Sequence, residues 1–205
     1  MNTEALSDNK LHELYCEWWS NRTSEEYNLH SIILEYENTY FADMTFQEDS
    51  LCWEIASFID EEFDHLYLEL SPAMYRCYIV DNKKPYWGQC NGMERTISIT
   101  QSHVSDKSVI LHEMIHAYEF ILSQHEPILQ EYLLLALYKK LLPSIPDLDK
   151  RLVEHSEIYG QHCVSSIGGN HGLLFYLKSL DLDIRCGYSL GTVCGYGRDS
   201  GKMFY

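Results

Sequence analysis

The residues of this 205-residue chain whose types and spacing could do chemistry are His112, Glu113 and His116. They form the pattern His-Glu-x-x-His. On an α-helix the two histidines lie one turn apart, about 40° from each other, so both imidazoles can bind one metal ion. Zinc is the metal that this pattern favours, and Glu113 is then placed to accept a proton from the water that attacks a carbonyl carbon.

The surroundings of the pattern indicate a buried helix. Its flanks are apolar on nearly every side, from Val109 to Leu122. Polar side chains inside such a helix are costly without a partner, and a metal ion supplies one. The sequence therefore predicts a metal centre and not two ordinary histidines on a helix surface.

A third ligand must come from downstream, because a catalytic zinc ion has three protein ligands and one open position. The metzincin continuation of the motif is absent, since Glu119 and Leu122 stand where it has glycine and histidine. His171 lies in a glycine-rich segment that lets the backbone approach another element closely. The other candidates are His125, Glu131, Glu154, His155, Glu157 and His162.

Two segments together resemble a known family. Leu111–Ala117, Leu-His-Glu-Met-Ile-His-Ala, is followed by Asn170–Phe175, Asn-His-Gly-Leu-Leu-Phe. This combination resembles the SprT-like (Spartan-type) zinc metalloproteases, and Trp87–Cys90 and the strand Arg95–Thr100 are similar to the family's segments upstream. The resemblance implies Zn²⁺ bound by His112, His116 and His171, with Glu113 as the catalytic base.

The chain also departs from that family. Fifty-four residues separate His116 from His171, more than the family usually has. Cys186 and Cys194 have no second pair of ligands nearby and so do not predict a zinc ribbon. A basic tail is also missing, so the resemblance is carried over for fold, metal and peptidase chemistry but not for DNA repair.

The elements that must position these residues follow from the pattern. Helical spacing predicts helices that begin at Ser7 or Asp8, at Ser24 and at Asp49 or Ser50. Strands are predicted at 75–80 and 95–100, with turns between them. Further helices are predicted from Ser105 or Asp106 to Ser123, at 132–142, at 148–163 and at 172–180.

Together these elements predict an α+β fold. The resemblance implies a zincin-like core, a small mixed or antiparallel sheet with the active-site helix. Residues 1–70 are expected to form an acidic helical part packed on this core, and residues 71–205 the catalytic core with a helical insertion at 124–167.

Two substrate-related roles are predicted from general zincin geometry. A substrate strand could pair with the strand before the active helix, which makes Thr96, Ile97, Ser98 and Ile99 the substrate-binding candidates. A group that stabilises the oxyanion is also expected. Tyr159, Tyr188 and Arg185 are its candidates, and the sequence does not choose among them.

The charge is uneven. The net charge is −16, and residues 1–70 hold 17 acids against the two bases Lys10 and Arg22. Residues 71–205 are nearly neutral, with 14 acids and 13 bases. Nucleic acid is therefore not a favoured partner. A basic protein, however, is compatible with the acidic residues 1–70, which we call the front end.

The compartment is expected to be intracellular, cytoplasmic or nuclear. The first residues carry acids and lack the apolar core of a secretory signal, and no apolar run is long enough to span a membrane. Seven cysteines without Cys-x-x-Cys pairs indicate reduced, mostly buried thiols.

The leading interpretation is a zinc-dependent endopeptidase that acts on a protein or peptide substrate. The first alternative is a specialised protease that cleaves one basic partner or host protein. The second is a non-catalytic module in which zinc only stabilises the fold. Glu113 disfavours the latter, since a purely structural site needs no base.

Overall fold

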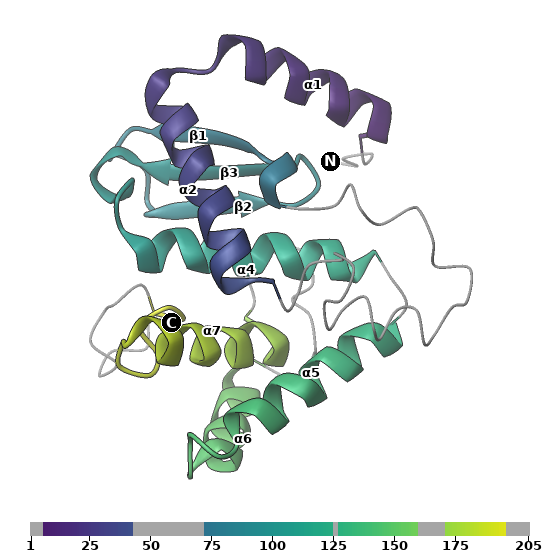
Figure 1. Ribbon diagram of the computed structural model, residues 1–205, viewed down its shortest axis with the longest axis vertical. Coiled ribbons are helices and arrows are strands. Elements are labelled where there is room, and N and C mark those ends of the chain that lie inside the picture. Colours follow the sequence, from purple (N-terminus) through teal and green to yellow (C-terminus); the bar gives the residue numbers. More distant parts are fainter. Residues whose placement is uncertain (1–5, 43–71, 125–126, 160–170, 196–205) are drawn as a thin grey trace.

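The computed structural model describes residues 6–42, 72–124, 127–159 and 171–195. These ranges form a mixed α+β fold with a small three-stranded sheet (Figure 1). In chain order the elements are α1 (Asp8–Asn21), α2 (Ser24–Tyr40), η1 (Pro72–Met74), β1 (Arg76–Val80), β2 (Gly88–Asn91), β3 (Thr96–Thr100), η2 (Gln101–His103), α4 (Lys107–Ser123), α5 (Pro127–Leu141), α6 (Leu148–Tyr159) and α7 (Leu173–Cys186).

The sheet has the strand order β1-β3-β2. β1 runs parallel to β3, with Cys77 opposite Ile97, and β2 runs antiparallel to it, with Cys90 opposite Ile97. Ile97 and Ile99 are completely buried, as the alternation of the predicted strand requires. Both predicted strands are confirmed to within a residue, whereas β2 had been predicted only as a segment with turns.

The two N-terminal helices begin at side-chain caps. The Ser7 hydroxyl accepts a hydrogen bond from the Lys10 amide at the start of α1. At α2, Thr23 and Glu26 form a reciprocal capping box, which satisfies two amides that the helix itself leaves without partners. These contacts confirm the two predicted starts, although the cap of α2 is Thr23 and not Ser24.

α1 is bonded to the sheet, and α2 to α4. The Trp18 indole donates a hydrogen bond of 3.1 Å to the Cys77 carbonyl on β1. At the other end of this part, the Tyr118 hydroxyl of α4 donates to the Glu37 carboxylate at 2.7 Å. Phe41 is completely buried and stacks on the Tyr118 ring at 4.7 Å. The described section of the acidic front end is thus continuous with the core.

Glycines let β2 lie directly against α4. A Cβ atom at Gly88 would come within 2.7 Å of the Glu113 side chain, and one at Gly92 within 2.0 Å of the Phe120 ring. Residues two apart in a strand share a face, so Gly88 and Cys90 both lie on the α4 side of β2. Gly92 follows the end of the strand and also faces α4. The close approach places the sheet beside the His-Glu-x-x-His helix.

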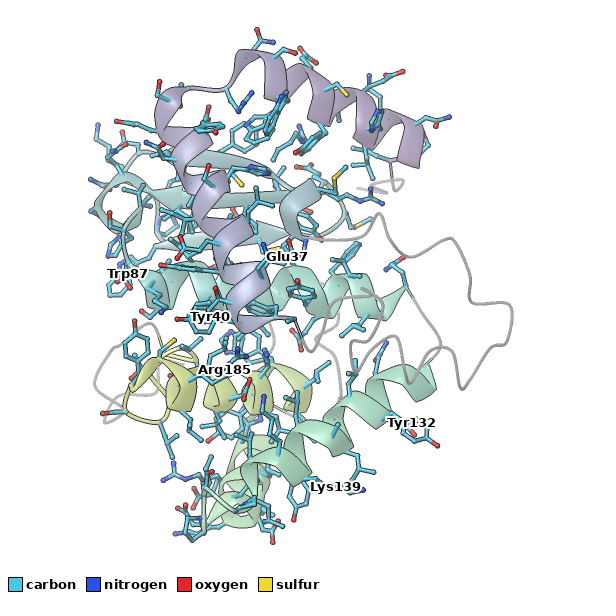
Figure 2. All side chains as sticks on the ribbon, viewed as in Figure 1. Glu37, Tyr40, Trp87, Tyr132, Lys139 and Arg185 are labelled. Carbon is cyan, nitrogen blue, oxygen red and sulfur yellow. The ribbon has the colours of Figure 1, made fainter. Side chains whose placement is uncertain are left out.

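The C-terminal helices assemble on the other side of α4. α7 packs against α4, α5 and α6, as Figure 1 shows for the lower half of the molecule. Arg185 of α7 donates hydrogen bonds to the carbonyls of Thr39 and Tyr40, and Figure 2 shows it beside the end of α2. α7 continues to Cys186, beyond the predicted end at Leu180.

Some predictions fall outside the described ranges. These are the third predicted helix, which begins at Asp49 or Ser50, and the end of the helix predicted to reach Cys163. Within the described ranges, no helix combines the length and apolar character that a membrane span requires.

Candidate metal centre

α4 holds the His-Glu-x-x-His motif in the interior. The helix begins with Asp106, whose carboxylate accepts hydrogen bonds from the Ser108 amide and hydroxyl at 3.0 and 2.8 Å. His112 and Glu113 are each 2% exposed, and apolar side chains around them are completely buried. This confirms the predicted buried helix, from Lys107 to Ser123.

α7 brings the third histidine to this helix. His171 lies just before Gly172, the residue from which α7 begins. One ligand atom each of His112, His116 and His171 lies within 4.8 Å of the other two, so the three imidazoles could hold one metal ion. The sequence candidate His171 is therefore placed beside the motif histidines.

Phe175 packs against all three rings. Its ring stacks on His171 at 4.2 Å and lies 4.8 Å from His112 and 4.5 Å from His116, centre to centre. It is completely buried. The residue four positions after His171 thus forms an apolar wall that limits how the imidazoles can rotate.

An oxygen atom lies near the Nδ1 atom of each motif histidine and orients its ring. His112 Nδ1 lies 2.9 Å from the Val193 carbonyl oxygen, so this nitrogen carries the proton and Nε2 keeps its lone pair. His116 Nδ1 lies 3.5 Å from a carboxylate oxygen of Glu119. Metal-binding histidines usually have such partners, which fix the tautomer and the direction of the ligating nitrogen.

Two of the histidines, His112 and His171, are held in the neutral form that binds metals. Burial, assisted by His116 and His171, lowers the pKa of His112 well below its ordinary value. Burial likewise lowers the pKa of His171 to about 3, with smaller effects from His116 and His155. At neutral pH both imidazoles therefore offer a lone pair without first losing a proton.

The donor set fits a zinc ion. Three imidazoles, with a fixed tautomer at His112, are the ligand type that zinc shares with other borderline metals. Burial and the carboxylates of Glu113 and Glu119 raise the pKa of the nearby Cys90 thiol well above its usual range. Cys90 thus remains protonated and does not compete as a thiolate ligand.

The other ligand candidates are not part of this cluster. Glu131, Glu154, His155 and Glu157 are described and lie outside the group of three. His125 and His162 fall outside the described ranges. The signal that separated His171 from the rest was its Gly-x-x-Phe context. In the structure Gly172 precedes α7, and Phe175 contacts all three histidine rings.

The predicted substrate strand lies in the middle of the sheet. Both edges of β3 are hydrogen-bonded, one to β1 and the other to β2. A substrate could add to Thr96, Ile97, Ser98 and Ile99 only by displacing a neighbouring strand. Substrate binding by these residues stays a prediction, which this topology does not favour.

The oxyanion candidates have different surroundings. The Arg185 guanidinium donates hydrogen bonds to the carbonyls at the end of α2. Burial raises the pKa of Tyr188, with a smaller effect from Cys186. The Tyr159 side chain is outside the described part. None of these contacts assigns the role to one of them.

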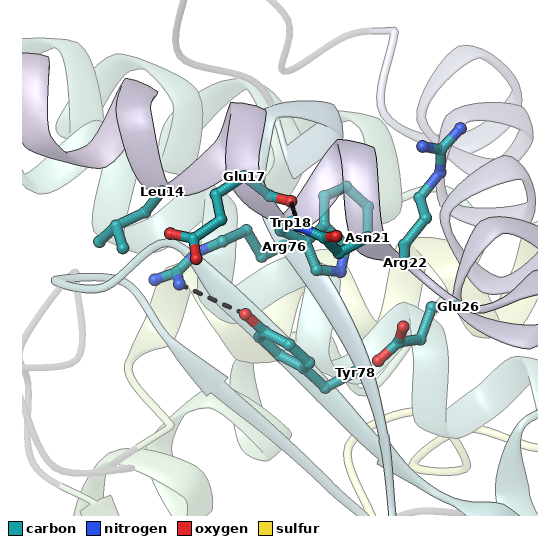
Figure 3. A pocket seen from close by; sticks show the side chains of 8 residues that line it. All are labelled: Leu14, Glu17, Trp18, Asn21, Arg22, Glu26, Arg76 and Tyr78. Atoms are coloured by element: carbon teal, nitrogen blue, oxygen red, sulfur yellow. Dashed lines mark hydrogen bonds between the residues drawn. The ribbon is translucent and has the colours of Figure 1, made fainter.

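A separate hollow lies beside β1, which is the edge strand of the sheet opposite β2. It has a volume of about 340 Å³ and is lined by α1, α2 and β1 (Figure 3). Glu17 and Glu26 line it together with Arg22 and Arg76, and Arg76 donates to the Tyr78 hydroxyl at 3.3 Å. No residue of the histidine cluster borders it.

Comparison with known proteins adds no relative. No protein-family model matches the chain, and no curated protein or solved structure matches it either. The assignment of function therefore depends on the residues and their geometry.

His155 predicts a pH dependence of stability near this site. It is 4% exposed and stacks on Tyr176 at 4.2 Å, and burial lowers its pKa from 6.5 to about 4. Its contribution to the free energy of unfolding is full above pH 6.5 and is lost as the pH falls toward 4, because only the unfolded chain takes up the proton readily. We expect a loss of about 2 kcal/mol between pH 7.5 and pH 5.

The measurement compares urea unfolding of the wild type and His155→Phe at both pH values, with chelator present throughout. The phenylalanine ring can stack on Tyr176 but cannot titrate, so its stability should fall less on acidification. Equal losses in both proteins would contradict the prediction.

Proposed function

We propose that this protein is a zinc-dependent endopeptidase with a SprT-like, zincin-type core. The observation that carries the proposal is the convergence of His112, His116 and His171 within 4.8 Å of one another, on and beside a helix that also carries Glu113. The three histidines would hold the metal. When bound, a zinc ion lowers the pKa of water and polarises a carbonyl oxygen, as hydrolysis of a peptide bond requires.

Glu113 performs the proton transfers. Its carboxylate takes a proton from the attacking water and delivers it to the amide nitrogen that leaves. The side chain is 2% exposed and held against Gly88, so its oxygens are positioned before substrate arrives. A buried carboxylate is costly in a site that only stabilises a fold, which favours catalysis over a structural role.

Metal content and cleavage test the proposal together. We expect about one zinc ion per purified chain by mass spectrometry, and cleavage of an unfolded protein substrate. A chelator should remove both, and added Zn²⁺ should restore both. A His116→Ala variant should lose zinc and activity. A metal-free wild type that cleaves unchanged, or a zinc-loaded one that cleaves no protein or peptide, would contradict the proposal.

Gly88 offers a test of how Glu113 is positioned. In Gly88→Ala the new methyl group would overlap the Glu113 side chain, since its position is 2.7 Å from Cγ and Oε1. The carboxylate must move, while the three histidines keep their places. We expect kcat to fall by about 10- to 100-fold with unchanged zinc content.

The matched control is Gly92→Ala, directly after the end of the same strand. Its methyl group would meet the Phe120 ring, at 2.0 Å from Cγ, and not a catalytic group. This variant should lose stability through overpacking but keep the kcat of its folded fraction. Equal effects of the two substitutions on kcat would show that β2 acts only through stability.

A further inference from the structure

α7 carries two buried carboxylates with different partners. Asp181 is 2% exposed and pairs with Lys140 at 2.8 Å and Lys178 at 3.1 Å. Asp183, two residues later, is completely buried. Its oxygens accept backbone hydrogen bonds, from the Gly191 amide at 2.6 Å and the Val193 amide at 2.9 Å.

These bonds hold the turn Gly191–Val193 in place. One carboxylate oxygen binds each end of the turn, and Gly191 has a φ of +94°, a conformation that favours glycine. The Val193 side chain is completely buried. The position of the Val193 carbonyl is therefore set by Asp183 from within α7.

That carbonyl is the partner of His112. His112 Nδ1 donates to it at 2.9 Å, across 81 residues of sequence. A continuous series of contacts thus runs from Asp183 through the turn to the imidazole of the first motif histidine.

We propose that Asp183 is a positioning residue for the metal centre, which fixes the Val193 carbonyl and through it directs Nε2 of His112 toward the metal. The inference rests on the proposed metal site. Outer-shell partners of this kind hold the ring orientation and raise the basicity of the ligating nitrogen.

The burial of Asp183 supports this role. Among the described residues its bonded partners are backbone amides and not cations. Burial raises its pKa to about 6, while the amides of Val193, Gly191 and Thr192 oppose the rise. It is thus mainly ionised at neutral pH and can accept at both oxygens. An apolar side chain would fill the same space without the cost of desolvating a charge.

The first test is Asp183→Asn in the full chain, which keeps the volume but removes one acceptor and the charge. Zinc affinity is measured by competition with a chromogenic chelator, and the ligand geometry by the visible spectrum of the Co²⁺-loaded protein. We expect zinc affinity to fall by about 10- to 100-fold and the Co²⁺ spectrum to change.

Asp181→Asn is the matched control on the same helix. It also removes a buried carboxylate charge, but one bonded to lysines instead of the turn. It should lower the stability of the folded chain and leave the affinity and the Co²⁺ spectrum of that chain unchanged. If it changed both as much as Asp183→Asn does, the effect would be one of general stability and the inference would be wrong.

A second pair of variants, one in the turn and one outside it as control, changes no buried side chain. Gly191 and Gly187 both have positive φ, +94° and +70°, and open space around their Cα atoms. Alanine strains the backbone at either position. Of the two amides, only that of Gly191 donates to the Asp183 carboxylate, whereas that of Gly187 donates to backbone carbonyls at the end of α7. Gly191→Ala should weaken zinc binding, and Gly187→Ala should not.

The outcomes separate the two proposals. A wild type that binds no zinc would overturn the proposed function and this inference with it. A wild type that binds one zinc ion, with the same affinity and spectrum in Asp183→Asn and Gly191→Ala, would overturn the inference alone.

Discussion

A Glu113→Gln variant should lose peptide hydrolysis by about 10²- to 10⁴-fold while it keeps its metal. The amide has nearly the size and shape of the carboxylate, so the packing against Gly88 persists. It cannot accept the proton of the attacking water, however. The loss should appear in kcat at saturating substrate, and zinc per chain should match the wild type.

The comparison with His116→Ala distinguishes the roles of the two residues. The histidine variant should lose zinc and activity together, whereas Glu113→Gln should lose activity alone. Retained activity in zinc-loaded Glu113→Gln would favour the structural alternative, in which the metal only stabilises the fold. Loss of zinc in Glu113→Gln would instead make Glu113 a ligand.

A Phe41→Ala variant should lower the free energy of unfolding by about 3–5 kcal/mol. Phe41 follows α2, is completely buried and stacks on Tyr118 of α4 at 4.7 Å and 12°. The Lys178 ammonium lies 5.0 Å from the same ring. Removal of the ring leaves a cavity between the front end and the core. The expected loss of unfolding free energy is large for a domain that is stabilised by about 5–15 kcal/mol.

Urea unfolding with Leu34→Ala as control measures this effect. Leu34 belongs to α2 but is 37% exposed, so its truncation should cost far less. Similar losses in the two variants would show that α2 does not depend on the buried contact. Near-wild-type stability of Phe41→Ala would mean that the front end can separate from the core.

The acids of residues 1–70 do not all have the same role. The concentration of acids in residues 1–70 predicts that this part influences substrate choice or solubility more than catalysis. Glu13 and Glu17 do have exposed side chains, but Glu37 is 5% exposed and accepts from Tyr118. Neutralising an exposed acid and removing Glu37 are therefore different experiments, and only the first tests recognition of a basic partner.

Sequence patterns predicted well what depends on local spacing. The start of α4 follows from the capping side chain of Asp106, and the alternation of Ile97 and Ile99 marks β3. His112 and His116 share a helix face because of the helical repeat. These features need no knowledge of distant residues.

Features that depend on distant partners were not predictable in the same way. α7 extends beyond its predicted end, and its added part contains the buried Asp181 and Asp183. Lys140, Gly191 and Val193, which bond to these carboxylates, lie outside the helix. β2 contains Gly88, a poor strand former, yet the close approach to Glu113 requires glycine there. The partner of His112 is a backbone carbonyl at Val193, which no side-chain pattern can indicate.

The contact between His112 and Val193 has a consequence for how the protein matures. Histidines at 112, 116 and 171 and a carbonyl at 193 belong to segments that the ribosome produces at different times. Contacts between such distant positions form late, after the cost of closing long loops has been met. Under the proposed function and the proposed role of Asp183, the nascent chain gains its full affinity for metal, and with it peptidase activity, only once residue 193 has emerged.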